Sequence, residues 1–256
     1  MESLKVSIVQ TSIYWEDPQA NLAMLTKKIE ELPQTNLIVL PEMFTTGFSM
    51  NAEKYAEQPS GNGFKWMQQQ AKQTKAAIVG SIMVKEDENY YNRLYFVYPN
   101  GDFITYNKRH LFSYAGEDTL FTAGQEQCVI DYLGWKFCLQ ICYDLRFPIW
   151  SRNTQGYDVL LYVASWPAKR IKAWDSLLPA RAIENMAYVI GVNRVGVDGK
   201  GYVHNGHSVV YNCLGEAMLP ITDIEQLTTL SLTKTHLAET RKKFPFLNDA
   251  DKFTVM

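Results

Sequence analysis

Three side chains with reactive polar groups each follow directly on an apolar run that is typical of a β-strand. They are Glu42 after Asn36–Pro41, Lys108 after Phe103–Asn107 and Cys142 after Trp135–Ile141. In open α/β sheets, ligand sites form outside the carboxyl ends of the strands. A thiol, a carboxylate and an amine gathered there could act as a nucleophile, its base and a cation that stabilises an oxyanion. The pattern therefore predicts a cysteine-dependent amide hydrolase.

Strands and helices that could position these groups alternate along both halves of the chain, and hairpins interrupt them. Two pairs of strands are expected as hairpins, one over Tyr90–Lys108 with its turn at Pro99–Asp102 and one around Leu133–Trp135. The other expected strands are Leu4–Ile8, Leu37–Leu40, Ala77–Val84, Asp158–Ala164, Ala187–Asn193, His207–Tyr211 and Thr228–Leu232. The expected helices are Pro18–Leu32 after an Asp17 cap, Asn62–Lys75, Pro148–Gln155, Ile171–Asn185 and His236–Lys243. This order predicts a mixed sheet, or two sheets face to face with helices outside. Without a linker or repeat, residues 1–256 are expected to form a single domain.

The composition is that of an ordinary globular protein with a sizeable core. The 256 residues are 46% hydrophobic and 20% charged, and the net charge is −2. Such a charge gives no basic field for nucleic acid. The longest apolar run, Val159–Ala164, is too short to span a bilayer, and residues 1–5 lack the apolar run of a signal peptide. A cytoplasmic enzyme without nucleic-acid or membrane partners is expected.

The four cysteines do not form the pattern of a disulfide framework. Cys138 and Cys142 are four residues apart, which on a strand separates them by about 13 Å, beyond the reach of a disulfide or a shared metal. Cys138 has apolar neighbours and is expected to be a small core residue. Free thiols favour a reducing compartment.

Five segments, taken together, resemble the motifs of the nitrilase superfamily of carbon–nitrogen hydrolases. They are Leu40–Phe44, Asn107–Phe112, Ile141–Pro148, Ala180–Asn185 and Asn193–Gly196. Within the superfamily, Ile141–Asn153 is most similar to the omega-amidase branch, which hydrolyses 2-oxoglutaramate and 2-oxosuccinamate. The resemblance implies an α/β fold, a four-layer αββα sandwich of two mixed sheets with helices on the outer faces. It also implies a homodimer and carbon–nitrogen hydrolysis without metal or organic cofactor.

Each reactive residue can be assigned a role in amide hydrolysis. Cys142 would attack the carbonyl carbon, and Glu42 would take the thiol proton and later return it to the leaving ammonia. Lys108 and the backbone N–H of Tyr143 would stabilise the oxyanion. Glu117 resembles the second active-site glutamate of the family and would position Lys108 or the substrate. Taken singly, Glu42, Lys108 and Glu117 could instead be solvated surface groups.

Aromatic residues beside the proposed site could wall a small substrate pocket. They are Phe44, Tyr143, Phe147 and Trp166. Most of the other aromatic residues are expected in the core or in a dimer interface.

Three cations could meet a carboxylate of the substrate: Arg146, Lys169 and Arg170. Arg146 is the strongest candidate because it lies closest in sequence to the nucleophile. Alternatively, it could form an internal ion pair with Asp144 or Glu184.

The histidines suggest two further interpretations, a Cys–His protease and a zinc site. Glu42 and Lys108 already fill the base and oxyanion roles, and no spacing of His110, His204 and His207 resembles a ligand motif. Structural or surface roles are therefore expected for the histidines, and no metal is invoked.

Two alternatives to omega-amidase activity stay open at this point. One is another reaction of the superfamily, namely N-carbamoyl hydrolysis or attack on a nitrile or another aliphatic amide. The other is a binding protein on this fold that has lost its chemistry. Retention of all three reactive residue types argues against the second alternative.

Overall fold

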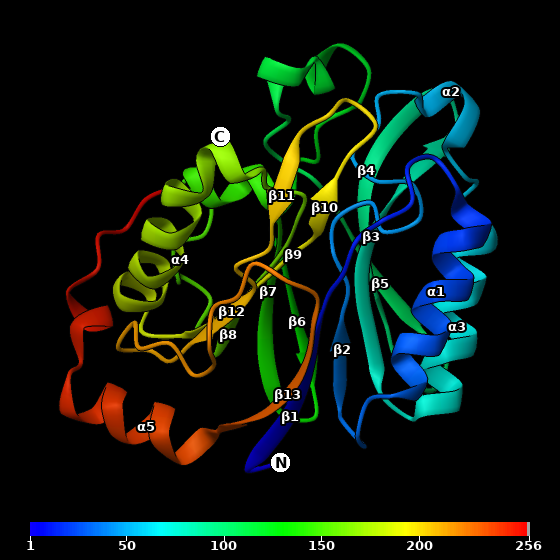
Figure 1. Cartoon of the computed structure of the whole chain (residues 1–256). Helices are drawn as coiled ribbons and strands as arrows, with labels where there is room; N and C mark the ends of the chain where they lie inside the picture. The colour runs from blue at the N-terminus through cyan, green and yellow to red at the C-terminus, as the bar shows by residue number, and fades with distance from the viewer. Residues whose placement is uncertain (255–256) are drawn as a thin grey trace.

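Two β-sheets pack face to face in the computed structural model, which describes residues 1–254 (Figure 1). Helices cover the outer side of each sheet, so the layer order is helix, sheet, sheet, helix. This arrangement confirms the predicted four-layer αββα sandwich.

The larger sheet has six strands, of which the three central ones are parallel and the others antiparallel to their neighbours. In spatial order they are β13 (Gln226–Thr233), β1 (Ser3–Gln10), β2 (Leu37–Val39), β3 (Ala77–Glu86), β4 (Asn89–Val97) and β5 (Phe103–Asn107). The sheet is therefore mixed, with short antiparallel connections between β3, β4 and β5.

The second sheet has five strands and the same mixed character, because β7, β8 and β9 are parallel while β6 and β12 are antiparallel. In spatial order they are β12 (Val209–Tyr211), β9 (Tyr188–Asn193), β8 (Val159–Ala164), β7 (Trp135–Ile141) and β6 (Cys128–Tyr132). A separate two-stranded ribbon, β10 (Val195–Val197) and β11 (Val203–Asn205), rises beyond the end of β9 (Figure 1).

Helices flank both sheets. The helices α1 (Pro18–Glu30) and α3 (Asn62–Thr74) cover the six-stranded sheet, and α4 (Ile171–Asn185) and α5 (Lys234–Lys243) lie outside the five-stranded sheet (Figure 1). A short helix, α2 (Ala52–Tyr55), lies at one end of the six-stranded sheet. Asp17 caps α1 as predicted, since its carboxylate accepts the N–H of Ala20 at 3.0 Å.

The two sheets share one hydrophobic core, formed by the side chains of their facing sides. Phe96 on β4 packs against Phe137 on β7 with ring centroids 5.8 Å apart. The hydroxyl of Tyr132 on β6 donates to the carbonyl of Asn36, just before β2, at 2.9 Å. These contacts fix the strand ends of one sheet relative to those of the other.

One local prediction is wrong, and three short elements were not predicted. Residues Pro148–Gln155 form successive turns, not a helix, because the Asn153 side chain bonds the backbone of Tyr157 through both its oxygen and its nitrogen. The strands β10 and β11 and the helix α2 were not predicted, and each has only three or four residues.

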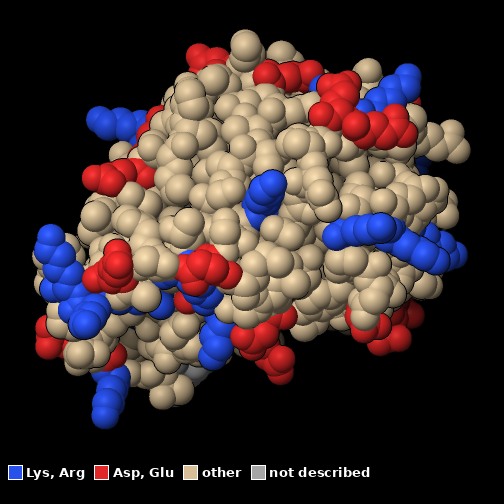
Figure 2. Space-filling model, turned by 90° about the horizontal axis from the view of Figure 1, so that it is seen from below, with Lys and Arg blue, Asp and Glu red and all other residues tan. Residues whose placement is uncertain are grey.

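Charged side chains of both signs are interspersed on the face seen in Figure 2, with broad uncharged areas between them. This pattern agrees with the small net charge of −2. Within residues 1–254, no helix combines the length and the apolar character needed to cross a membrane.

Candidate active site

The ends of β2, β5 and β7 bring Glu42, Lys108 and Cys142 to one cavity between the two sheets. Lys108 and Glu42 are almost fully buried, and the thiol residue is only 9% exposed. The Lys108 ammonium donates to Glu42 Oε1 at 2.8 Å. The structure therefore brings together the three reactive groups that the sequence singled out, and none is a solvated surface group.

Glu42 is tied to both sheets. It follows β2, yet its carboxylate Oε2 accepts the backbone N–H of Ser165 at 2.8 Å, just after β8. Its own backbone N–H donates to the carbonyl of Ala164 at 3.3 Å. Since both contacts are made to the backbone, they hold the carboxylate in place between the sheets.

Lys108 lies between two buried carboxylates. Besides Glu42, it donates to Glu117 Oε1 at 3.0 Å and to Oε2 at 2.9 Å. Burial alone would lower the pKa of Lys108, but the charges of Glu117 and Glu42 outweigh it and raise the pKa, so the amine stays cationic. Glu117 is completely buried, which excludes its reading as a solvated loop residue. Burial raises the pKa of Glu117, and Lys108 opposes that rise.

Cys142 begins a 3-10 turn, Cys142–Arg146, with a φ of 44°. A positive φ is uncommon for a residue other than glycine, and such backbone strain gathers at functional sites. Burial raises the pKa of the thiol well above its ordinary value, and the carboxylate of Glu42 raises it further. The resting group is therefore a neutral thiol, which would have to lose its proton to become a nucleophile.

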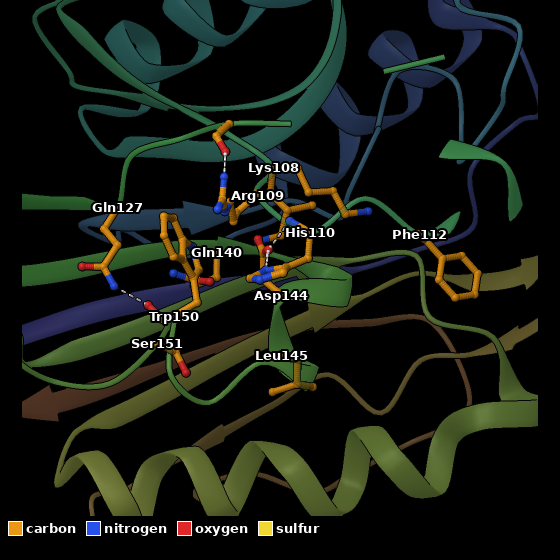
Figure 3. Close-up of polar contacts among 12 residues, drawn as sticks. Lys108, Arg109, His110, Phe112, Gln127, Gln140, Asp144, Leu145, Trp150 and Ser151 are labelled. Carbon is orange, nitrogen blue, oxygen red and sulfur yellow. Dashed lines mark hydrogen bonds and ion pairs between the residues drawn. The ribbon is translucent and has the colours of Figure 1, made fainter. Parts of the chain in front are cut away.

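A third buried carboxylate, Asp144, connects the loop that carries Lys108 to the turn that carries Cys142. Asp144 accepts the backbone N–H and the ring Nδ1–H of His110 at 2.9 and 2.8 Å (Figure 3). It also accepts the hydroxyl of Tyr106 at 2.8 Å and the N–H of Ile141 at 2.9 Å. In Figure 3, Lys108 extends away from this cluster. The cluster thus connects the segments that carry two of the reactive groups.

The cavity above Cys142 has a volume of about 280 Å³, and its wall combines aromatic with charged side chains. Tyr143 and Trp166 line it, as the sequence predicted. The other aromatic residues in the wall are Phe48, Phe112, Tyr114 and Tyr202. Phe147 is not among the lining residues, because its ring stacks on His110 with centroids 3.8 Å apart.

Phe44 does not belong to the pocket, which corrects the sequence prediction. Its backbone N–H donates to the carbonyl of Ser81 on β3, so the chain still runs beside the sheet at this point. The fully buried ring packs instead against Trp66 of α3, with centroids 5.6 Å apart. Phe48, four residues further on, lines the cavity, and its ring centroid lies 5.1 Å from Lys108 Nζ.

Two arginines line the cavity without a carboxylate partner among the described residues. The guanidinium of Arg146 lies 5.0 Å from the ring centroid of Trp166, and that of Arg170 lies 4.8 Å from the ring centroid of Phe112. Lys169 is not a lining residue.

The alternative of an internal ion pair for Arg146 is wrong for both proposed partners. Asp144 is occupied by the His110 cluster, and Glu184 instead pairs with Arg181 at 2.9 Å. Arg146 is exposed at the mouth of the cavity, where its charge is available to a ligand.

Sequence reasoning missed several polar residues of the site, since Ser165, Asp198 and Lys200 also line the cavity, and two of the missed residues contact the buried groups. Asn92 on β4 donates from its amide to Glu42 and Glu117. His204 on β11 lines the cavity, and its Nε2 lies 3.4 Å from the hydroxyl of Ser165. Burial, together with the charge of Arg194, lowers the pKa of His204 to about 4, so the ring is neutral at pH 7. His204 is therefore a neutral polar group in the pocket wall.

Comparisons with known proteins agree with this geometry. The carbon–nitrogen hydrolase family profile matches residues 5–242. The omega-amidase YafV of Yersinia enterocolitica is 45% identical over the full length of both chains, and a 2-oxoglutaramate amidase of Bacillus subtilis is 32% identical over 96% of this chain and 97% of its own. The crystal structure of a CN-hydrolase superfamily protein from Xanthomonas campestris, with an arsenic adduct in its active site, is 40% identical, covers 100% of both chains and has a TM-score of 0.98. The chain belongs to the carbon–nitrogen hydrolase family, in the nitrilase superfamily that the five sequence motifs indicated.

Proposed function

We propose that the protein is an omega-amidase that hydrolyses the terminal amide of a short 2-oxo dicarboxylic acid monoamide, such as 2-oxoglutaramate or 2-oxosuccinamate. One observation carries the proposal. A buried thiol, carboxylate and ammonium open onto a cavity whose mouth holds the exposed guanidinium of Arg146. Relatives named as an omega-amidase and a 2-oxoglutaramate amidase support the same activity.

In the first step, the sulfur of Cys142 bonds to the amide carbon while its proton passes to Glu42. The carbonyl electrons move to the oxygen, which becomes an oxyanion. The ammonium of Lys108 and the backbone N–H of Tyr143 stabilise that charge. Proton transfer during attack is required because the pKa of the resting thiol is well above its ordinary value.

In the second step, the oxyanion collapses and the carbon–nitrogen bond breaks. Glu42 returns the proton to the nitrogen, which leaves as ammonia, and the acyl group remains on Cys142 as a thioester. A water molecule then attacks the thioester and gives one proton to Glu42. Collapse of this second oxyanion releases the new carboxylic acid, and the proton on Glu42 restores the thiol.

The carboxylate of the proposed substrate, at the end opposite the amide, accounts for the cations in the pocket. A carboxylate some three or four carbons from the amide would carry a charge into a partly aromatic cavity, where it needs a charged hydrogen-bond donor. Arg146 and Arg170 line that cavity, whereas Lys108 is already occupied by two carboxylates. A small anionic amide therefore fits this site better than a neutral one.

Turnover of three substrates tests the proposal. We expect kcat/KM for 2-oxoglutaramate to exceed that for N-carbamoyl-β-alanine and for a simple aliphatic nitrile by at least about 100-fold, equivalent to about 2.7 kcal/mol of transition-state stabilisation. The Cys142→Ala variant serves as the blank for each substrate. Faster turnover of the carbamoyl compound or the nitrile would assign the protein to another reaction of the superfamily. Absence of turnover of all three would reject the amidase proposal.

A further inference from the structure

Asn92 is a buried polar residue on β4 whose neighbours along the inward side of the strand are the apolar Leu94 and Phe96. Its side-chain nitrogen donates to Glu42 Oε1 at 2.8 Å and to Glu117 Oε1 at 3.1 Å. Its side-chain oxygen has no hydrogen-bond partner among the described residues. A buried acceptor without a partner destabilises a fold, so the contacts of the nitrogen need an explanation.

The hydrogen bonds of Glu117 leave it no room for a proton. A carboxylate offers four lone-pair sites, two on each oxygen. Lys108 donates to both oxygens, Asn92 donates to Oε1, and the backbone N–H of Phe112 donates to Oε2 at 2.6 Å. All four sites are filled by donors, which oppose the rise in the pKa of Glu117 that burial causes and favour its ionised form, and an ionised Glu117 in turn holds Lys108 in its cationic form.

Glu42 has one fewer donor. Among the described residues, Oε1 accepts from Lys108 and Asn92, and Oε2 accepts only from the backbone N–H of Ser165. None of these donors can accept a proton, because they are an ammonium, an amide NH₂ and a backbone N–H. The one lone-pair site left open is therefore on Oε2.

We propose that Asn92 is a positioning residue that directs the thiol proton to Oε2 of Glu42. By filling one site on each carboxylate, its amide blocks protonation of Glu42 Oε1 and of Glu117 Oε1. The reverse orientation would put the amide oxygen against two carboxylates, which explains why the oxygen is the end left without a partner. This inference rests on the proposed function, in which Glu42 is the base.

The proposal also accounts for the charge of the site during attack. With Lys108 cationic and both glutamates ionised, the three groups carry one net negative charge. When Glu42 takes the thiol proton, that charge appears on the oxyanion while the Lys108–Glu117 pair is unchanged. Because Asn92 keeps the proton off Glu117, Lys108 remains a cation at the moment the oxyanion forms.

The test is the pH dependence of Cys142 alkylation by iodoacetamide, followed by mass spectrometry, in Asn92→Leu, Asn92→Ala and Asn92→Ser. Asn92→Leu keeps the approximate shape of the side chain without a donor, and Asn92→Ala replaces it if Asn92→Leu does not fold. Asn92→Ser keeps one donor. Without the amide, the ionised carboxylates lose a donor and take up protons more readily. We expect the pH at which the alkylation rate falls on the acidic side of the profile to rise by roughly 0.5–1 unit in Asn92→Leu and Asn92→Ala. The rise should be smaller in Asn92→Ser.

The matched control is Asn153→Ala. Asn153 is also buried, and its amide donates to the carbonyls of Tyr157 and Asn185, away from the three ionised groups. This variant should lose thermal stability while its acidic limb stays at the wild-type pH. With 2-oxoglutaramate, the Asn92 variants should lose about 10- to 100-fold in kcat with little change in KM.

Asn92 would be a purely structural residue if two results were found together. The acidic limb would stay at the wild-type pH in every Asn92 variant, and the rate losses would follow thermal stability, as in Asn153→Ala. Alkylation requires no substrate, so it reports on Asn92 even if none of the proposed amides is hydrolysed. Failure of the proposed function and failure of this inference are thus separate results.

Discussion

At the scale of single residues, the two neighbouring thiols differ in their surroundings more than in their acidity. Burial raises the pKa of Cys138 to about 12 and raises that of Cys142 well above its ordinary value. Only Cys142 lines the cavity that also contains Glu42 and Lys108. Cys138 lies in the core of β7, and its sulfur faces the amide of Gln140 at 3.5 Å. Access to the cavity and to its carboxylate, not acidity at rest, distinguishes Cys142 as the proposed nucleophile.

Arg146→Met should depress kcat/KM for 2-oxoglutaramate far more than for a neutral amide of similar length. A hydrogen bond to a charged group contributes about 1.5–3 kcal/mol, so the selective loss should be about 10- to 150-fold. Lys169→Met is the control, because Lys169 does not line the cavity, and it should change both substrates little. If folded Arg146→Met lost the same kcat/KM on both substrates, Arg146 would not bind the substrate carboxylate. Arg170 or backbone groups would then have that role.

His204 should make the fold less stable in mild acid. Its pKa is lowered from 6.5 to about 4, so the unfolded chain binds a proton in a pH range where the folded protein does not. Stability from the neutral ring is thus present above pH 6.5 and is lost as the pH falls toward 4. Urea unfolding should show about 2 kcal/mol of loss from this group between pH 7 and pH 5, which His204→Gln removes. An unchanged loss in that variant would contradict the lowered pKa.

The residues of the site differ in how far sequence could identify them. Glu42, Lys108 and Cys142 were found because each follows a strand, and strand ends of open sheets gather at one edge. Asn92 carried a signal that was overlooked, a polar residue on the inward side of β4. His204 reaches the pocket only through the pairing of β10 and β11, which no apolar pattern marks.

At the scale of elements, sequence patterns identified the long strands and helices best. The helix α4 begins and ends at the predicted residues, Ile171 and Asn185. The ribbon of β10 and β11 was missed because three-residue strands show too little alternation. The predicted helix at 148–155 is absent because the Asn153 side chain bonds the backbone of Tyr157 and of Asn185, and the contact with Asn185 depends on the fold, not on local propensity.

Asp144→Asn should loosen the connection between the Cys142 turn and the Lys108 loop. The buried carboxylate accepts four hydrogen bonds, and in the variant an amide nitrogen would face some of these donors instead. We expect a loss of about 1–3 kcal/mol in unfolding free energy and a lower kcat. Asp131→Asn, the same change at an exposed position of β6, should alter neither. Wild-type kcat in folded Asp144→Asn would show that the two segments hold their places without this carboxylate.

At the scale of the whole molecule, the site depends on the two sheets staying together, since Glu42 and Cys142 follow strands of different sheets. The facing sides of both sheets contribute to one hydrophobic core. The single domain over residues 1–256 stays a prediction, as do the homodimer and the cytoplasmic location.

A single cooperative unfolding transition follows from the shared core. Tryptophan fluorescence and far-UV circular dichroism should report the same midpoint in urea. Trp66 packs against the six-stranded sheet, Trp135 lies in the shared core, and Trp174 of α4 packs against the outer side of the five-stranded sheet, so fluorescence samples both sheets. Two separated transitions would contradict the single-domain prediction.

The acyl-enzyme tests the central claim most directly. Wild-type protein turning over 2-oxoglutaramate is quenched in acid, digested and analysed by mass spectrometry. The peptide that contains Cys142 should carry the mass of one 2-oxoglutaryl group, bound as a thioester that hydroxylamine removes. Cys138→Ala should show the same adduct, and Cys142→Ala should show neither adduct nor turnover. Continued turnover in Cys142→Ala, or an acyl group on another residue, would contradict the account.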